Sequence, residues 1–278
     1  MTVLRQGDKG HAVRDLQAAL NRAGAALYID GDFGTETEAA LMAYQQRTGL
    51  VVDGIAGPKT LRALAGGDCS ALLKESDLVG AADRLGVELA VIKAVNEVES
   101  RGSGFFAPGK PAILFERHIM HRQLQRRALS VGGDPDSVGR HLDELMQAHP
   151  NLINPRPGGY AGGLAEYPRL ARARMIDDSS AIESTSWGLF QIMGFHWQTL
   201  GYASAQDYAQ AMAAGEGQQL DAFVRFVEAD PALHKALKGR KWATFARLYN
   251  GPAYARNLYD VKLSRAYSRH KDGEQAAA

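Results

Sequence analysis

One pattern that occurs twice near the N-terminus constrains the fold of this chain more strongly than any other feature. It reads DGDFGTET at residues 30–37 and DGIAGPKT at residues 53–60. Each copy has an Asp-Gly turn, a second glycine, and then a Thr or Pro that opens a helix ending in Ala-Leu. Two copies are too few for a solenoid. The pattern therefore predicts a small helical module with a duplicated turn.

A further helix is expected ahead of the two copies. Gly7 and Gly10 mark a turn, after which apolar residues follow at helical spacing: Val13, Leu16 and Leu20. The helical pattern breaks at residues 65–68, which read AGGD. We therefore predict a first module over residues 1–66 and a linker over residues 67–75.

An apolar helix is predicted over residues 88–99, with two carboxylates in its last turn. At 100° per residue, one face carries three apolar side chains: Val91, Val95 and Val98. Glu99 lies at the edge of that face. Burial there would disfavour the ionised carboxylate and raise its pKa, which a glycosidic general acid needs. The alternative is a solvated glutamate near a helix end.

The second carboxylate of this helix points elsewhere. Glu97 lies about 200° around the helix from Glu99, so the two acids cannot enter one cleft. Lys93 is four residues before Glu97, and we expect the two side chains to form a surface ion pair.

Three stretches farther along contain features that could belong to a functional site. Glu116 follows the apolar run 113–115, so a strand or helix start places an acid in the interior or against Arg117 or a histidine. Residues 154–163 form a Pro/Gly-rich loop, expected to be mobile, that either borders a sugar cleft or has no role. Gln191 lies in a tight apolar turn, and a buried glutamine must be hydrogen-bonded.

Two histidines and the C-terminal residues give weaker indications of a functional site. His118 and His121 have a spacing that a metal can use, but no third ligand is evident, and two surface histidines on a helix are the simpler interpretation. Residues 258–271 predict a basic surface helix. Residues 272–278 are expected to be disordered.

Composition excludes several classes of protein. The 278-residue chain has a net charge of +1, so no overall field attracts it to nucleic acid or an anionic membrane. Its single cysteine, Cys69, excludes an intrachain disulfide and disfavours a cysteine-based zinc site. A signal peptide and a membrane span are not expected. We expect a monomer with no cofactor, metal, nucleic-acid partner or stable membrane insertion.

Residues 3–65, with their duplicated turn, resemble the peptidoglycan-binding domain, a three-helix bundle found in many cell-wall hydrolases. Within this module we name three candidate wall-binding residues: Asp30, Phe33 and Tyr44. Three later motifs resemble signatures of the lysozyme-like superfamily: Glu99-Ser100, the stretch from Ser186 to Met193, and Tyr249-Asn250-Gly251. Residues 76–270 are similar to the N-acetylmuramidase domain of modular phage endolysins.

The resemblance implies a mainly α fold, in which the three-helix bundle (1–66) and linker (67–75) precede a larger α-helical lysozyme-like domain (76–271). It implies that Glu99 is the general acid that helps to hydrolyse the β-1,4 bond between N-acetylmuramic acid and N-acetylglucosamine. The expected substrate-binding residues are Ser186, Gln191, Tyr249 and Asn250. Phe190 replaces the methionine that is common in that turn.

The second catalytic carboxylate is left open between Glu183 and Glu116, with Asp177 and Asp178 as weaker candidates. The alternatives for function are a lytic transglycosylase, which needs one acid, and a non-catalytic wall-binding protein. An amidase or peptidase is disfavoured because neither a zinc cluster nor a Cys/His pair is evident. The resemblance also implies synthesis in a host cytoplasm, release across the inner membrane, and lysis through periplasmic peptidoglycan.

Overall fold

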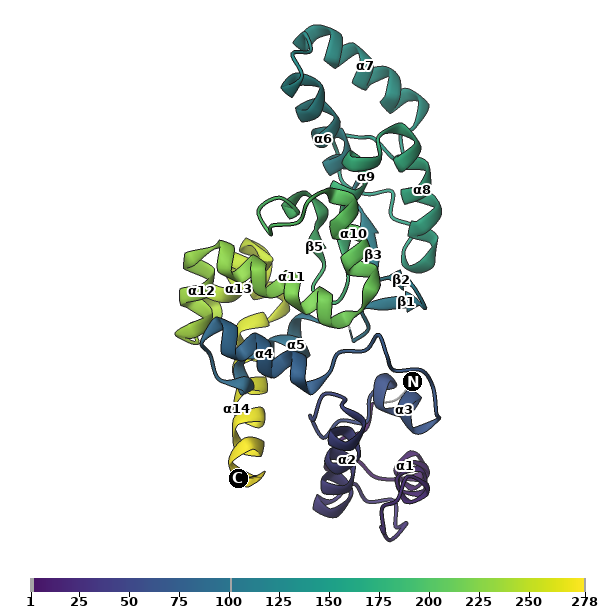
Figure 1. Ribbon diagram of the computed structural model, residues 1–278, viewed down its shortest axis with the longest axis vertical. Helices are drawn as coiled ribbons and strands as arrows, with labels where there is room; N and C mark the ends of the chain where they lie inside the picture. The colour runs from purple at the N-terminus through teal and green to yellow at the C-terminus, as the bar shows by residue number, and fades with distance from the viewer. Residues whose placement is uncertain (1–2, 101, 278) are drawn as a thin grey trace. The chain divides into compact units, whose positions relative to one another are not determined.

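The computed structural model describes residues 3–100 and 102–277, and the chain divides into two compact units. The first unit contains residues 1–102 together with residues 215–278, and the second contains residues 103–214. Helices predominate in both units, and strands are short (Figure 1). The predicted mainly α fold class is therefore confirmed.

The N-terminal module is a three-helix bundle, as predicted. Its helices are α1 (His11–Arg22), α2 (Thr35–Thr48) and α3 (Pro58–Leu64). Their apolar faces meet in a core that includes Val13, Leu16, Leu20, Phe33 and Leu41. The periodic apolar residues seen in the sequence are therefore the residues that hold the bundle together.

A buried glutamine organises each copy of the repeated turn. In the second copy, Gln45 Oε1 accepts the backbone N–H groups of Asp53 and Gly54. Its Nε2 donates to Asp53 Oδ1, the Ile55 carbonyl and Thr60 Oγ1. Gly54 has a φ of 68°, a conformation that glycine adopts without steric cost. The repeated motif is thus a turn that folds around one side chain of the preceding helix.

The first copy has the same arrangement around Gln17. Gln17 accepts the N–H of Gly31 and donates to Asp30 Oδ1, the Asp32 carbonyl and Thr37 Oγ1. Asp30 Oδ1 also accepts the N–H of Asp32, which closes the turn. The two turns are therefore structural duplicates, in which the Asp, Gly and Thr residues of each copy hydrogen-bond to the glutamine.

Replacing Gln45 by alanine is expected to destabilise the module by about 2–6 kcal/mol, because two backbone N–H groups, one buried and one partly buried, lose their acceptor at about 1–3 kcal/mol each. Chemical denaturation of the full chain measures this loss. The neighbouring Gln46 is exposed, so Gln46→Ala serves as the matched control and should change stability by less than about 0.5 kcal/mol. Equal effects of the two substitutions would contradict the structural role of Gln45.

The rest of the first unit is helical. It contains α4 (Glu75–Leu85), α5 (Leu89–Glu99), α11 (Glu216–Ala229), α12 (Pro231–Lys238), α13 (Trp242–Asn250), the 3₁₀ helix η3 (Pro252–Asn257) and α14 (Tyr259–Ala277). Helix α14 packs along α5, and α4 packs against α5 and α11 (Figure 1). Helix α5 is the element predicted over residues 88–99, and its start differs by one residue.

The C-terminal end differs from the prediction. Helix α14 continues through residue 277, so the expectation of disorder is wrong for residues 272–277, and Ala278 lies outside the described residues. The sequence here reads DGEQAA, in which Glu, Gln and Ala are favourable helix formers that extend an existing helix.

The predicted linker is an integral part of the first unit. Leu73, at its end, is 1% exposed, and its N–H donates to the buried carboxylate of Glu216. Lys59 of the N-terminal module forms an ion pair with the same carboxylate at 2.7 Å. These contacts place the module, the linker and α11 in one compact unit, whereas the sequence suggested a separate module ending at residue 66.

The second unit combines helices with two small antiparallel sheets. Its elements are β1 (Phe105–Ala107), β2 (Lys110–Pro111), β3 (Ile113–Phe115), α6 (Arg117–Ser130), α7 (Pro135–Ala148), η1 (Gly163–Ala165), α8 (Glu166–Ile176), α9 (Asp178–Glu183), β4 (Thr185–Trp187), β5 (Ile192–Met193), η2 (Gly194–His196) and α10 (Ala205–Ala214). Strand β1 pairs with β2, and β4 lies between β3 and β5.

The β3-β4-β5 sheet has a buried face and a more open face. Side chains alternate along a strand, and the buried set comprises Ile113, Phe115, Thr185, Trp187 and Ile192. Leu114 pairs with Ser186 across the strands, so these two residues share the other face. Glu116 follows two residues after Leu114 and continues the same side of the strand. On this second face Leu114 and Glu116 are half-buried, whereas Ser186 is 6% exposed.

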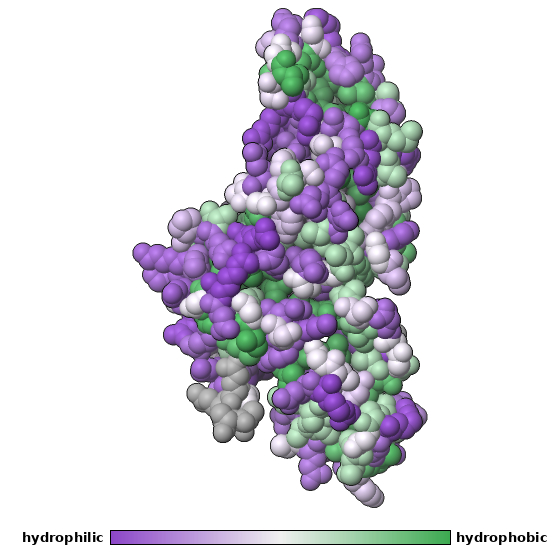
Figure 2. Space-filling view, viewed as in Figure 1, coloured by the Kyte–Doolittle hydropathy of each residue, from purple (hydrophilic) through white to green (hydrophobic). Residues whose placement is uncertain are grey.

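Among the described residues, no helix is both long and apolar enough to cross a membrane. The face in view is largely hydrophilic, with small hydrophobic areas, one of them over the α6–α7 turn (Figure 2). Leu129 and Val131 are exposed there.

Candidate active site

Glu99 is the last helical residue of α5. Ser100 leaves the helix with φ −77° and ψ 139°, so the chain turns away directly after the carboxylate. Burial raises the pKa of Glu99 from its ordinary value to about 7, although an Asn250 hydrogen bond and the Lys262 charge oppose the shift. The helix dipole also disfavours a negative charge at this end. Glu99 is therefore about half protonated at neutral pH, and the upward direction of its pKa shift is the one that the sequence predicted.

One oxygen of Glu99 is held in place. Asn250 Nδ2, from the end of α13, donates to Glu99 Oε1 at 2.9 Å. Within the described part of the chain, this is the hydrogen bond that Glu99 receives, and Oε2 takes part in none. The structure thus brings together two residues that lie 151 positions apart in the sequence.

Tyr249 helps to fix the end of α13. Its ring stacks on Phe245 at a centroid distance of 5.7 Å and meets Phe223 and Phe226 edge to face. Aromatic pairs in such geometries add stability beyond the area they bury. The Tyr249 ring is therefore part of an aromatic cluster, and the next residue, Asn250, is the one that contacts the acid.

The predicted ion pair between Lys93 and Glu97 is wrong. Lys93 is 7% exposed, and its ammonium contacts Glu75 at 2.7 Å and the Val52 carbonyl at 2.8 Å. Glu97 is hydrogen-bonded by Arg269 and His270 of α14, which keep its pKa below the ordinary value although burial alone would raise it. Both partners come from elements that helical spacing cannot reveal.

Ser186 and Gln191 lie in the second unit and contact each other. Ser186 Oγ donates to Gln191 Oε1 at 3.1 Å, and Gln191 Nε2 donates to the carbonyls of Gly188 and Ala112. Gln191 has a φ of 51°, which is uncommon for a residue other than glycine. Such strained conformations often occur at functional sites. As the sequence indicated, the side chain is fully hydrogen-bonded.

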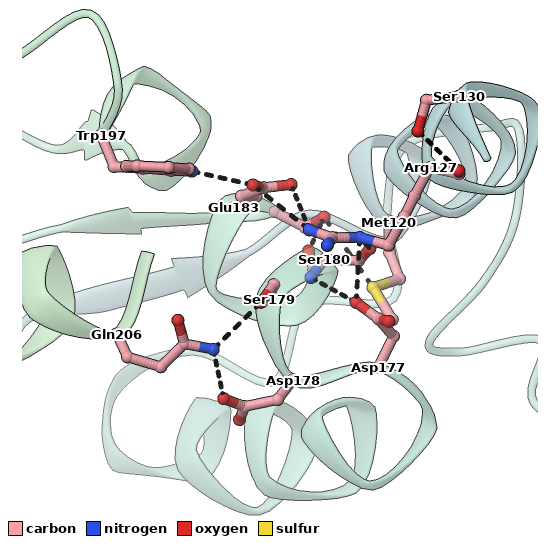
Figure 3. Close-up of polar contacts among 11 residues, drawn as sticks. Met120, Arg127, Ser130, Asp177, Asp178, Ser179, Ser180, Glu183, Trp197 and Gln206 are labelled. Atoms are coloured by element: carbon pink, nitrogen blue, oxygen red, sulfur yellow. Dashed lines mark hydrogen bonds and ion pairs between the residues drawn. The ribbon is translucent and has the colours of Figure 1, made fainter. Parts of the chain in front are cut away.

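Glu183, at the end of α9, belongs to a polar network with Arg127 of α6 and with Trp197, the residue that follows η2 (Figure 3). The Trp197 indole donates to Glu183 Oε1 at 2.9 Å, and the Arg127 guanidinium lies 3.4 Å from both carboxylate oxygens. The weaker candidates have local roles: Asp177 accepts the N–H of Ser180 and caps α9, and Asp178 pairs with Arg174.

Glu116 follows β3 directly. Its backbone N–H donates to the Ser184 carbonyl at 2.8 Å, which extends the strand pairing by one bond. Tyr160 Oη donates to Glu116 Oε2 at 2.7 Å, and His118 Nδ1 lies 3.2 Å from the same oxygen. The sequence left Arg117 or a histidine as the neighbour of the Glu116 carboxylate, and the structure shows the histidine, His118.

The three wall-binding candidates differ in exposure. Phe33 is completely buried in the module core, so its prediction as a contact residue is wrong. Tyr44 is 7% exposed, with Arg47 over its ring at 5.6 Å. Asp30 is exposed and lines a surface recess of about 600 Å³ with Lys9, His11, Arg14 and Asp32.

Sequence reasoning missed several residues of these sites. The sequence places Tyr160 in a loop and indicates no partner for it, and no motif points to Lys262 or Trp197. The pair Glu166 and Arg169, at helical spacing i and i+3, carried a signal that could have been used. Its two side chains form a buried ion pair at 2.6 Å.

Comparison with known proteins agrees with this geometry. The N-acetylmuramidase family model matches residues 88–271, and a peptidoglycan-binding domain model matches residues 9–64. The crystal structure of the Burkholderia AP3 phage endolysin is 51% identical in sequence, with a TM-score of 0.87; the match covers 98% of this chain and all of that one.

Curated relatives match over shorter stretches. A zinc D-Ala-D-Ala carboxypeptidase of Streptomyces albus G is 50% identical over 60 residues, which are 20% of this chain and 24% of that protein. The N-acetylmuramoyl-L-alanine amidase CwlM of Mycobacterium tuberculosis is 50% identical over 56 residues, or 20% and 14% of the two chains. The chain therefore spans less than a quarter of the length of these relatives.

The muramidase match covers most of the chain, and the structural match covers nearly all of it. The predicted membership is thereby confirmed: this chain belongs to the N-acetylmuramidase family and carries a peptidoglycan-binding domain ahead of its muramidase domain.

Proposed function

We propose that the chain is an endolysin that hydrolyses the β-1,4 bond between N-acetylmuramic acid and N-acetylglucosamine, with Glu99 as the general acid. One observation carries this proposal. Glu99 is a partly buried carboxyl with a pKa of about 7, and a single amide holds one of its oxygens. A glycosidase acid needs this protonation state and this fixed orientation.

The chemistry follows from the position of the proton. Asn250 donates to Oε1, so the proton of neutral Glu99 resides on Oε2 and can pass to the glycosidic oxygen as the bond to the anomeric carbon breaks. Proton transfer in the transition state contributes about 10²–10⁴-fold to the rate. The Lys262 charge, which favours ionised Glu99, stabilises the carboxylate left behind.

The N-terminal module supplies the second part of the function. We assign wall binding to the recess that contains Asp30, with Lys9 and Arg14 beside it. This recess offers both signs of charge, which suits a polymer whose sugars carry hydroxyls and whose peptides carry carboxylates and amines. Peptidoglycan is accordingly the partner of both parts of the chain.

The site of action follows from the substrate. Peptidoglycan of a Gram-negative host lies in the periplasm, so the proposed route is synthesis in the host cytoplasm, release across the inner membrane, and lysis. Expression in a bacterial host with and without an inner-membrane pore tests this route. Lysis only with the pore supports it, and lysis without the pore contradicts it.

The pH profile of kcat provides a test of the assigned acid. Activity should fall as the pH rises through about 7, where Glu99 loses its proton. The Asn250 hydrogen bond lowers the pKa of Glu99, so Asn250→Ala should raise that pKa and shift the alkaline limb to higher pH. Initial rates on purified peptidoglycan between pH 4 and 10 measure the shift.

A matched control for this substitution is Asn257→Ala, at an exposed position in η3. The control should leave the alkaline limb where the wild type has it. A limb that does not move in Asn250→Ala, or that moves to lower pH, would contradict the role of Asn250 and weaken the assignment of Glu99.

A further inference from the structure

A surface groove lies between α1 and α3 of the N-terminal module, on a different face from the recess that contains Asp30. Its volume is about 340 Å³, within the range of about 300–1,000 Å³ that is typical of small-ligand sites. The side chains that line this α1–α3 groove are leucines and alanines, except for Asp15 and Arg22. All of them belong to the three-helix module, so the groove is complete within one small bundle.

Leucines form the floor of the α1–α3 groove. Leu4 and Leu16 are buried, and Leu61 and Leu64 pack partly against the same core. The groove is therefore an apolar depression over the core of the module. A ligand with small apolar side chains would cover this surface and gain the free energy of removing it from water.

Alanines keep the groove open on the α1 side. Ala12 and Ala19 both line it and are seven residues apart, so they lie on one face of the helix, two turns from each other. Alanine is the good helix former with the smallest side chain. A larger residue at either position would fill the space between α1 and α3.

Two charges of opposite sign flank the apolar floor. Asp15 and Arg22 are seven residues apart on α1, which is about 10 Å along the helix axis. Asp15 lies 3.8 Å from His11 in a pair whose side chains are 74% and 89% exposed. Arg22 is exposed and takes part in no hydrogen bond or ion pair with the residues that the structure describes. Both charges are therefore accessible to a ligand.

This pattern fits the peptide part of peptidoglycan better than its glycan part. The peptide stems are short, contain alanine residues, and carry free amino and carboxyl groups. An extended peptide spans about 3.3–3.6 Å per residue, so the separation of the two charges corresponds to about three residues. The N-acetylated sugars carry no positive charge and would leave Asp15 without a partner.

We infer that the α1–α3 groove binds the peptide stem of peptidoglycan. The amino group of the stem pairs with Asp15, a carboxylate pairs with Arg22, and the alanyl methyl groups cover the apolar floor. This inference rests on the proposed function, which makes peptidoglycan the partner of the module. The groove adjoins the recess that contains Asp30, because His11 lines the recess and contacts Asp15. The two sites therefore contact neighbouring parts of one polymer.

Titration calorimetry of the full chain with a synthetic tetrapeptide stem tests this inference. Asp15→Asn and Arg22→Gln should each weaken the affinity about 2–5-fold, the effect of one exposed ion pair. The matched controls are Glu36→Gln and Arg62→Gln, which remove the same charges from exposed positions of α2 and α3 outside the groove. These two variants should bind the tetrapeptide as the wild type does.

Modified peptides test which charge contacts which residue. Acetylation of the peptide amine removes the partner of Asp15, so Asp15→Asn should have no further effect on the affinity for the acetylated peptide. Amidation of the peptide carboxylates should abolish the effect of Arg22→Gln in the same way. A substitution that weakens binding of the modified and unmodified peptides equally would overturn the assigned contact.

A bulky side chain tests the groove itself. Ala12 is exposed, so Ala12→Trp should fill the groove without removing a core side chain. Affinity for the tetrapeptide should fall at least about 10-fold while the thermal stability of the chain is unchanged. Gln46→Trp, at an exposed position of α2, is the matched control and should retain wild-type affinity.

Three results would overturn the inference: no binding of the tetrapeptide, binding that none of the groove substitutions weakens, or binding of peptide-free glycan strands in its place. A loss of tetrapeptide affinity in Lys9→Gln alone would also overturn it, because Lys9 lines the recess and not the groove. The proposed function fails separately, if the wild type neither pellets with insoluble peptidoglycan nor cleaves it. Calorimetry with the soluble peptide does not depend on cleavage, so the two failures are distinguishable.

Discussion

Glu99→Gln should lower kcat on peptidoglycan by about 10²–10⁴-fold and leave wall binding unchanged. Glutamine matches the size of glutamate and can accept the Asn250 hydrogen bond, but it has no acidic proton for the glycosidic oxygen. KM should change little, because the loss concerns the transition state rather than binding of the ground state. Release of soluble fragments from purified peptidoglycan measures kcat, and pelleting with the insoluble wall measures binding.

The matched control lies two residues earlier on the same helix. Glu97 is bonded to Arg269 and His270 on α14, so Glu97→Gln should affect stability but keep kcat within a few fold. Comparable losses of kcat in the two variants would contradict the assignment.

The wild type should also lose stability as the pH rises from about 4.5 to about 7, where the folded state holds the Glu99 proton more tightly than the unfolded state. Glu99→Gln removes this pH-dependent loss.

Glu166→Ala should destabilise the chain by about 3–5 kcal/mol, the cost of breaking a buried ion pair by removing one partner. Glu166 is completely buried and accepts hydrogen bonds from Arg169, Phe115, Ala161 and Gly162. Without it, the buried guanidinium of Arg169 has lost its counterion. Urea denaturation followed by tryptophan fluorescence measures the change.

A double variant serves as the control for this prediction. Glu166→Leu combined with Arg169→Met removes both charges and keeps an apolar volume, so it should be more stable than Glu166→Ala. The loop containing Tyr160 should become protease-sensitive in both, because the N–H groups of Ala161 and Gly162 lose their acceptor. A cost below about 1 kcal/mol for Glu166→Ala would show that this pair does not hold the second unit together.

The parts of the fold that the sequence predicts well are local and periodic. The three helices of the first module follow from one apolar pattern and one repeated turn, and α5 was predicted because its apolar face and its terminator lie within a dozen residues. The burial of Glu99 follows from the same helical periodicity. In these segments the information lies within a few turns of the residue concerned.

The parts that could not be predicted depend on contacts between distant segments. Lys93 is buried because Glu75 and Val52 cover it, and Glu97 pairs with α14, which lies more than 160 residues farther along. Helical spacing suggests the neighbour at i−4 and contains no information about either contact. That Asn250 belongs to the same site as Glu99 was predicted from the family resemblance, because helical periodicity contains no information about it.

The repeated motif shows a different limit. Its Phe33 was named as a wall-binding candidate, but the residue is in the core, and Gln17 and Gln45, which organise the turns, lie outside the repeat. A recurrent motif can mark a binding face or a folding requirement, and composition alone does not separate the two. For Tyr160, the 44 residues to Glu116 place its partner beyond any local pattern.

The chemical identity of the new sugar ends shows which bond of peptidoglycan the enzyme breaks and how. Purified peptidoglycan is digested with the wild type and with Glu99→Gln, and the fragments are identified by mass spectrometry after reduction. We predict reducing N-acetylmuramic acid ends with the wild type and none with the variant. Anhydro-muramic ends would instead identify a lytic transglycosylase. Reducing N-acetylglucosamine ends would overturn the bond specificity. Wall binding without any cleavage would contradict the proposal that the chain is an enzyme.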